Sequence, residues 1–116
     1  MLRTCALIFA AHLSLATAAP AQTYVAGIDD LPLMPGLIEQ DGAGLVFDKP
    51  EGRIVEAVAS GNGTPQAVAD YYAKVLPQLG WQRRADGSYT RENERLAIAA
   101  RTDGARITVQ FTLSPN

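Results

Sequence analysis

Residues 105–113 read Ala-Arg-Ile-Thr-Val-Gln-Phe-Thr-Leu, and large apolar side chains alternate with polar ones along the stretch. A period of two places the apolar side chains on one face of a β-strand and the polar ones on the other. Because the second face is polar throughout, we expect this strand to belong to a sheet with one buried face. The other face would be solvated or form an interface.

The residues before this strand continue the β pattern. Segments 81–84, 88–91 and 95–101 are short strand candidates, and Asp-Gly pairs stand in the connections 85–87 and 102–104. Asp-Gly is typical of tight hairpin turns, and short turns join antiparallel neighbours. The sequence therefore predicts a four-stranded antiparallel meander after residue 80.

A single helix is predicted between Thr64 and Gly80. Thr64 suits the N-cap, Pro65 the first helical position and Gly80 the C-terminal cap. Pro77 removes a backbone donor, so the helix must kink there or end near Leu76. The apolar residues recur at helical spacing and form one face: Val68, Tyr72, Val75, Leu76 and Leu79.

The fold class follows from adding the residues before the helix. Segments 45–48 and 53–60 predict a hairpin around a turn at 49–52. Residues 22–43 contain Pro32, Pro35 and Gly36 and predict an irregular entry segment, with Leu31, Leu33 and Met34 as apolar anchors. We therefore expect one α+β domain over 44–116. It has two layers, one helix packed on a mainly antiparallel sheet, with the strand order ββαββββ in sequence.

Residues 1–21 have the pattern of a secretory signal peptide. Arg3 is followed by an alanine-rich apolar run and by the triplet Ala-Pro-Ala at 19–21. Such triplets precede signal-peptidase cuts, so we expect cleavage before Gln22, with the triplet 16–18 as a second option. The apolar run is shorter than the roughly 20 residues of a membrane span. Cys5 precedes the run, so no lipid anchor is expected, and the protein would be periplasmic or secreted by a bacterium.

The predicted signal peptide contains the only Cys and the only His of the chain. The remaining chain would have no thiol for a disulfide or zinc site and no imidazole for a nucleophilic or acid–base system. We therefore expect no metal, no cofactor and no catalytic residue, and we expect the protein not to be an enzyme. Without Arg3, nine basic and twelve acidic residues remain. This balance argues against a nucleic-acid partner.

Arginines are concentrated in the predicted meander, where neighbouring strands can bring them onto one face that binds an anion or an acidic partner. In the alternative, they are solvated and form cross-strand pairs with Glu92 and Glu94. The candidate interaction surface consists of Arg83, Arg84, Arg91, Arg101, Arg106 and Tyr71.

Two further kinds of residue offer chemistry. Trp81 could stack on a ligand, although an aromatic residue at this place more often pins a helix end to a sheet. Four carboxylates are candidates for a hydrolase pair, but nothing in their spacing predicts the separation of about 5–9 Å that glycosidases use. These are Asp29, Asp30, Asp48 and Glu51.

Three motifs resemble a broad group of small, mostly uncharacterised bacterial secreted and envelope α+β proteins. These are the Pro-Gly entry at 31–36, the aromatic-pair helix at 64–72 and the Gly-Trp step in 76–81, followed by the β-meander. Many members of this group look like lipoproteins, whereas this chain has no cysteine at the cleavage site. The resemblance implies a fold and a compartment, but it implies no activity.

These observations favour a non-catalytic protein-interaction module whose partner is an envelope protein or a second copy of the chain. A second copy could pair through a sheet edge at the long last strand. The first alternative is a domain that binds a small molecule or an anion between the helix and the entry segment. The second alternative is a carboxylate-dependent hydrolase.

Overall fold

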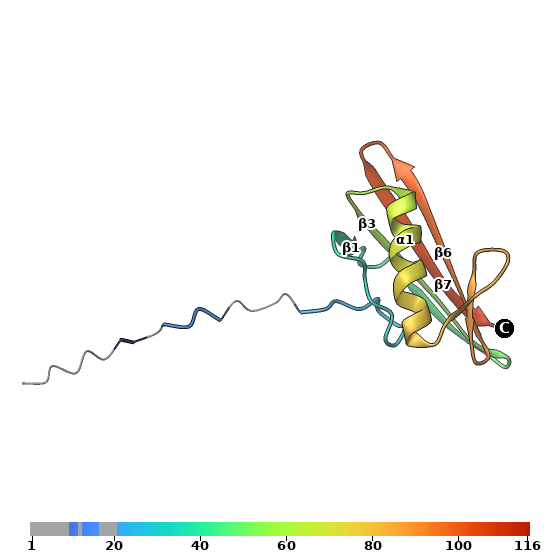
Figure 1. The fold of residues 1–116 in the computed structure, drawn as a ribbon. Coiled ribbons are helices and arrows are strands. Elements are labelled where there is room, and N and C mark those ends of the chain that lie inside the picture. Colours follow the sequence, from blue (N-terminus) through green and yellow to red (C-terminus); the bar gives the residue numbers. More distant parts are fainter. Residues whose placement is uncertain (1–9, 12, 17–20) are drawn as a thin grey trace, which may run out of the picture.

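A computed structural model describes residues 10–11, 13–16 and 21–116 (Figure 1). Part of the predicted signal peptide, including residues 17–20 before the predicted cut, lies outside the described residues. In the described part, no helix is long and apolar enough to cross a membrane. The elements are β1 (Leu37–Glu39), β2 (Leu45–Lys49), β3 (Gly52–Gly61), α1 (Pro65–Val75), the 3-10 helix η1 (Leu76–Leu79), β4 (Gln82–Arg83), β5 (Tyr89–Arg91), β6 (Glu94–Asp103) and β7 (Arg106–Pro115).

The strands form one antiparallel sheet in the order β1-β3-β7-β6-β5-β4, and β2 pairs with the first half of β3. A mostly antiparallel sheet with a single helix fits the predicted α+β class. The long last strand β7 lies between β3 and β6, so the expectation that it offers a free edge is wrong. The free edge beyond β3 is formed by β1 and β2 instead.

The predicted element order lacks one strand, because three strands precede the helix. Leu37–Glu39 pairs with Ala59–Gly61 of β3 within the segment that was predicted to be irregular. Its backbone approaches β3 so closely that a Cβ at Gly61 would overlap the carbonyl oxygen of Gly36. A strand of three residues is too short for alternation to be visible in the sequence.

The helix begins and ends for the predicted reasons. The Thr64 hydroxyl accepts a hydrogen bond of 3.1 Å from the backbone N–H of Ala67. The α-helix ends at Val75, just before Pro77, and the chain continues as a 3-10 turn to Gly80, whose φ of 89° ends it. Glycine adopts this left-handed conformation without steric cost.

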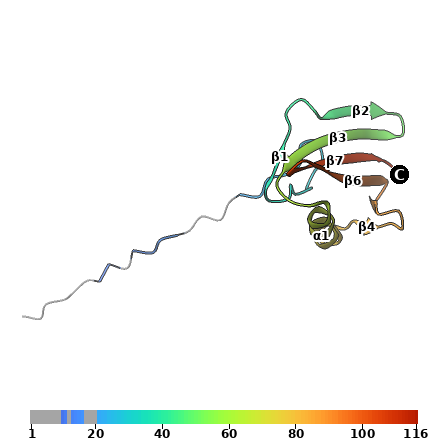
Figure 2. The same cartoon turned by 90° about the horizontal axis from the view of Figure 1, so that it is seen from above.

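The core lies between α1 and the face of the sheet that carries the apolar side chains of β7 (Figures 1 and 2). The ring of Tyr72 packs edge-on against Phe111, with the ring centroids 5.6 Å apart. The predicted inward residues of β7 are all buried, namely Ile107, Val109, Phe111 and Leu113. On the opposite face Gln110 is exposed, and we call this side of the sheet the open face.

The entry segment completes this core. Leu31 and Leu33 are buried as predicted, together with Val25 and Ile28. Backbone hydrogen bonds join Val25 N–H to the Leu31 carbonyl and Leu33 N–H to that of Thr23, at 2.9 and 2.8 Å. The Tyr72 hydroxyl fixes the segment to the helix.

That hydroxyl donates to the Pro32 carbonyl at 2.8 Å and accepts from the Met34 N–H at 3.1 Å. Burial raises the pKa of Tyr72, so its hydroxyl remains protonated and continues to donate. The Pro32 carbonyl and the Met34 N–H both belong to a proline-containing segment. In the protein interior such backbone groups need a hydrogen-bond partner, and Tyr72 provides it.

We expect Tyr72→Phe to lower the free energy of unfolding by about 1–3 kcal/mol, because it leaves a buried carbonyl and a backbone N–H without a hydrogen-bond partner. Urea denaturation measures the loss. Tyr71→Phe is the matched control, since the neighbouring ring is only partly buried and its hydroxyl has no hydrogen bond within the described residues. Equal losses in the two variants would contradict this role of Tyr72.

Candidate functional site

The structure divides the predicted arginine surface between the two faces of the sheet. Arg101 pairs in register with Thr108, and Arg106 is the next residue of β7 on the same face, so the two arginines are diagonal neighbours on the open face. Arg83 pairs with the buried Tyr89 and therefore lies on the helix side of the sheet. Arg84 follows β4 and lies near Thr90 and Arg95. The two pairs of arginines do not form one cluster.

Arg91 is part of the protein's internal framework. Its guanidinium donates to both carboxylate oxygens of Asp30, at 2.9 and 3.1 Å, and to the Leu79 carbonyl at 2.9 Å. It also lies over the Trp81 ring, 4.4 Å from the centroid. The hydrogen bonds that Arg91 donates to Asp30 raise the pKa of Arg91, which keeps the guanidinium charged. Arg91 therefore joins the entry segment, the helix end and β5.

Asp30 has a left-handed backbone conformation, with φ of 56°. Aspartate tolerates this conformation better than most residues, although at some cost. The two-pronged contact with Arg91 holds Asp30 in place and gives the entry turn a defined position. Asp30, one of the candidate hydrolase carboxylates, is thus engaged in an ion pair.

Trp81 and Tyr71 are packing residues. Trp81 is 2% exposed, and its backbone N–H bonds to the Leu76 carbonyl at 3.1 Å, which supports the predicted role of pinning the helix end to the sheet. Its indole N–H is buried without a partner among the described residues. Tyr71 is partly buried, and its ring meets that of Tyr72 edge-on at 4.9 Å. Both aromatic side chains contribute to the core more than to a ligand surface.

The other candidate hydrolase carboxylates lie at two different turns. Asp48, near the end of β2, and Glu51, in the turn between β2 and β3, belong to one hairpin, where Asp48 pairs in register with Arg53. Asp29 lies in the turn of the entry segment. Arg95 of β6 forms an ion pair with Asp86 in the turn before β5. Acidic residues therefore occur mainly in turns and in pairs with arginine, where acids commonly occur.

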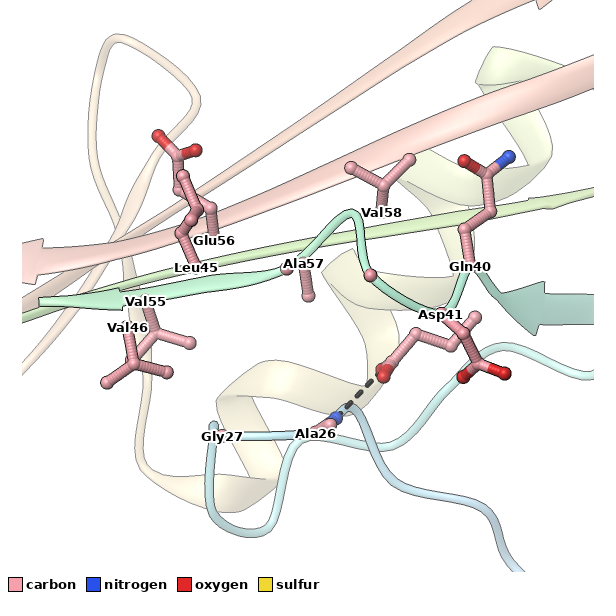
Figure 3. A pocket seen from close by; sticks show the side chains of 13 residues that line it. Ala26, Gly27, Gln40, Asp41, Leu45, Val46, Val55, Glu56, Ala57 and Val58 are labelled. Carbon is pink, nitrogen blue, oxygen red and sulfur yellow. Dashed lines mark hydrogen bonds between the residues drawn. The ribbon is translucent and has the colours of Figure 1, made fainter.

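A cavity of about 310 Å³ opens where the edge of the sheet is interrupted (Figure 3). Between β1 and β2 the loop 40–44 arches away from β3, and Gln40 N–H still reaches the Val58 carbonyl at 2.8 Å. The entry segment closes the other side, where Ala26 N–H donates to the Glu39 carboxylate at 2.8 Å. This cavity touches the entry segment, but β2 and β3 form its floor, and α1 contributes none of its lining.

Glu39 and Asp41 border this cavity, and its floor consists of the apolar Val55 and Ala57. Glu56 also lines it, but its side chain points to the opposite side of the sheet, together with that of Leu45 (Figure 3). A negative rim over an apolar floor favours a small cationic ligand over an anion.

A smaller depression of about 170 Å³ lies on the open face. Val58 and Ala99 form an apolar floor, and Arg101, Thr108 and Gln110 form a polar rim. The β-strand alternation that buries Val109 and Phe111 places these residues on the outer side. The depression adjoins the Arg101 and Arg106 pair, so cationic and apolar surface meet at this place.

One surface was missed by the analysis of the sequence. Four large apolar side chains are exposed along the free edge of the sheet: Ile38 at 71%, Leu45 at 49%, Val46 at 62% and Phe47 at 51%. The signal was present, because Leu45-Val46-Phe47 is an apolar run without alternation. Such a run cannot turn all its side chains to one buried face of a strand.

No protein-family model, no curated protein and no solved structure matches this chain. The resemblance to small bacterial envelope proteins therefore remains a prediction, and the geometry of the chain itself supports the proposals below.

We expect the Arg91 contact to stabilise the fold through its geometry as well as its charge. A double-mutant cycle of Arg91→Ala and Asp30→Ala should give a coupling of about 1 kcal/mol, since the pair is two-pronged but partly exposed. Arg91→Lys should not restore the loss, because lysine cannot donate two parallel hydrogen bonds while covering Trp81. Full stability of Arg91→Lys in thermal unfolding would contradict this account.

Proposed function

We propose that this chain is a non-catalytic interaction module that acts in the periplasm or outside the cell. It would bind an acidic segment of a partner protein on the open face of the sheet. The observation that carries the proposal is the depression with an apolar floor beside Arg101 and Arg106. In a two-layer arrangement with the helix on one side, this face remains available to a partner.

The chemistry of the depression suits a protein ligand. Interfaces commonly centre on a small apolar patch with a polar rim, and arginine is enriched among the residues that dominate binding. Arg101 and Arg106 are both exposed, and neither belongs to an ion pair of the described residues. Their guanidinium groups can each grip a carboxylate with two hydrogen bonds.

A small-molecule binding domain is the alternative that a specific feature favours. The cavity in Figure 3 has a volume of about 310 Å³, at the lower end of the range for ligand sites. Its carboxylates suit a cation, so we propose amines as the ligand class in this alternative. A carboxylate-dependent hydrolase receives less support, because Asp30 is bound by Arg91 and Asp48 is in register with Arg53.

Photo-crosslinking in intact cells tests the open face. We expect a photoreactive residue at Gln110, on the open face, to capture one partner protein, and the same residue at Gln78, exposed on η1, to capture none of it. The double variant Arg101→Glu/Arg106→Glu should abolish capture, because it turns attraction for an acidic segment into repulsion.

The charge control is Arg83→Glu/Arg84→Glu, which makes the same charge change at and just after β4, the edge strand separated from β6 by β5. This control should still capture the partner. Equal loss in both double variants, or capture of the partner from Gln78 as readily as from Gln110, would contradict the proposed surface.

A further inference from the structure

The strand β2 has a free edge, and the first three of its five residues are large and apolar. β2 pairs with β3 on one side, and within the described part of the chain no strand covers its other side. All five of its residues are exposed, including the large side chains of Leu45, Val46 and Phe47. Native proteins usually protect such an edge with charges, prolines or a covering loop, because it is a template for pairing with another strand.

The hairpin fixes which backbone groups of β2 are free. A loop of two residues, Pro50 and Glu51, joins Lys49 to Gly52, and these two flanking residues pair in register. The pair next to a two-residue loop is hydrogen-bonded, and hydrogen-bonded pairs recur at every second residue. The N–H and C=O groups of Val46 and Asp48 therefore point away from β3 toward the free edge.

We propose that a second copy of this chain pairs with β2, antiparallel and around a two-fold axis at Phe47. In this register Val46 lies opposite Asp48 of the second copy, and Asp48 lies opposite its Val46. The four free backbone groups of each copy then bond to those of the other. Phe47 meets Phe47 of the second copy across the axis, where close cross-strand aromatic pairs are favourable.

Charge complementarity identifies the occupant as a second copy. In this register Lys49 lies opposite Leu45 of the second copy, and Glu56 is the neighbour of Leu45 on β3. Lys49 and Glu56 of the other copy are then two strands apart, about 10 Å between Cα atoms, a gap that their side chains can span. Neither residue takes part in an ion pair of the described residues. The two-fold axis creates this pair twice.

Other registers that use the same backbone groups are poorer. An axis at Asp48 places two aspartates directly opposite each other, which is repulsive. An axis at Val46 places Asp48 opposite Gly44 and separates the two Phe47 rings. Pro50, which has no N–H, ends the ladder on one side, and the loop at 40–44 ends it on the other. The paired segment is therefore short, and a weak, concentration-dependent dimer is expected.

Dimerisation would join the two sheets and bring their open faces side by side. Leu45 and Phe47 lie on the open face, because they pair in register with Glu56 and Ile54. In Figure 3 the side chains of Leu45 and Glu56 point to the same side of the sheet, and those of Val46 and Val55 to the other. The inference extends the proposed function without depending on it, because pairing at β2 requires no other partner.

Sedimentation velocity of the protein purified after export, over a wide concentration range, tests the proposal. The wild type should shift from monomer to dimer with rising concentration. Val46→Pro should remain monomeric, since it removes an N–H that β3 does not use. Phe47→Lys should also remain monomeric, because it places two like charges across the axis. Circular dichroism identifies a variant that fails to fold.

A charge swap tests the register. Lys49→Glu and Glu56→Lys should each weaken the dimer about tenfold, and the double swap should restore it, because opposite charges then face each other again. Within one chain the two residues are not cross-strand partners, so a rescue reports pairing between copies. A chain that stays monomeric at every concentration, or a dimer that ignores these substitutions, overturns the proposal. If the chain is monomeric, the partner of the β2 edge would be an extended strand of another protein. The crosslinking expected at Gln110 does not depend on this result.

Discussion

Tyr72 lies where the helix, the sheet and the entry segment meet, and its hydroxyl bonds to two backbone groups of that segment. Its ring packs on Phe111 in the middle of the sheet, so a single side chain connects all three parts of the core. One helix cannot cover a sheet of this width alone. The entry segment supplies the missing apolar cover through Leu31 and Leu33, and it does so because Tyr72 satisfies the polar backbone that comes with them. The Arg91 contact with Asp30 then fixes the turn of the same segment that precedes Leu31.

This arrangement determines which surfaces remain for partners. The helix and the entry segment both lie on one side of the sheet, so the opposite face and the β1–β2 edge have no cover within the described residues. The interruption of that edge at 40–44 creates the acidic cavity, and β2 beyond it presents an apolar strand to solvent. For the same reason, the arginines lie in two different environments. Arg91 points into the junction of helix and entry segment, whereas Arg101 and Arg106 lie on the open face.

Local patterns predicted most of the elements, because alternation, capping and turn chemistry are properties of neighbouring residues. The β7 stripe, the Thr64 cap, the helix end before Pro77 and the meander of antiparallel neighbours are of this kind. What the sequence could not predict depends on distant pairing. β1 exists only because three residues meet the end of β3, and Asp30 finds Arg91 across 61 residues of chain. The free edge was misassigned to β7 for the same reason, since alternation within a strand does not reveal its neighbours. Of the predicted surface, Arg101 and Arg106 share a face, and Arg83, Arg84 and Arg91 lie elsewhere.

Native-state hydrogen exchange tests most directly whether the entry segment is part of the core. The amides of Val25 and Leu33 bond to carbonyls within the segment, and those of β7 lie in the middle of the sheet. If the Tyr72 junction holds the segment as described, the Val25 and Leu33 amides should exchange only through global unfolding. They should then show the same opening free energy and denaturant dependence as the Val109 and Phe111 amides. Exchange of Val25 and Leu33 through a local opening, orders of magnitude faster and insensitive to denaturant, would show that the segment detaches from an intact sheet and helix and would contradict the account.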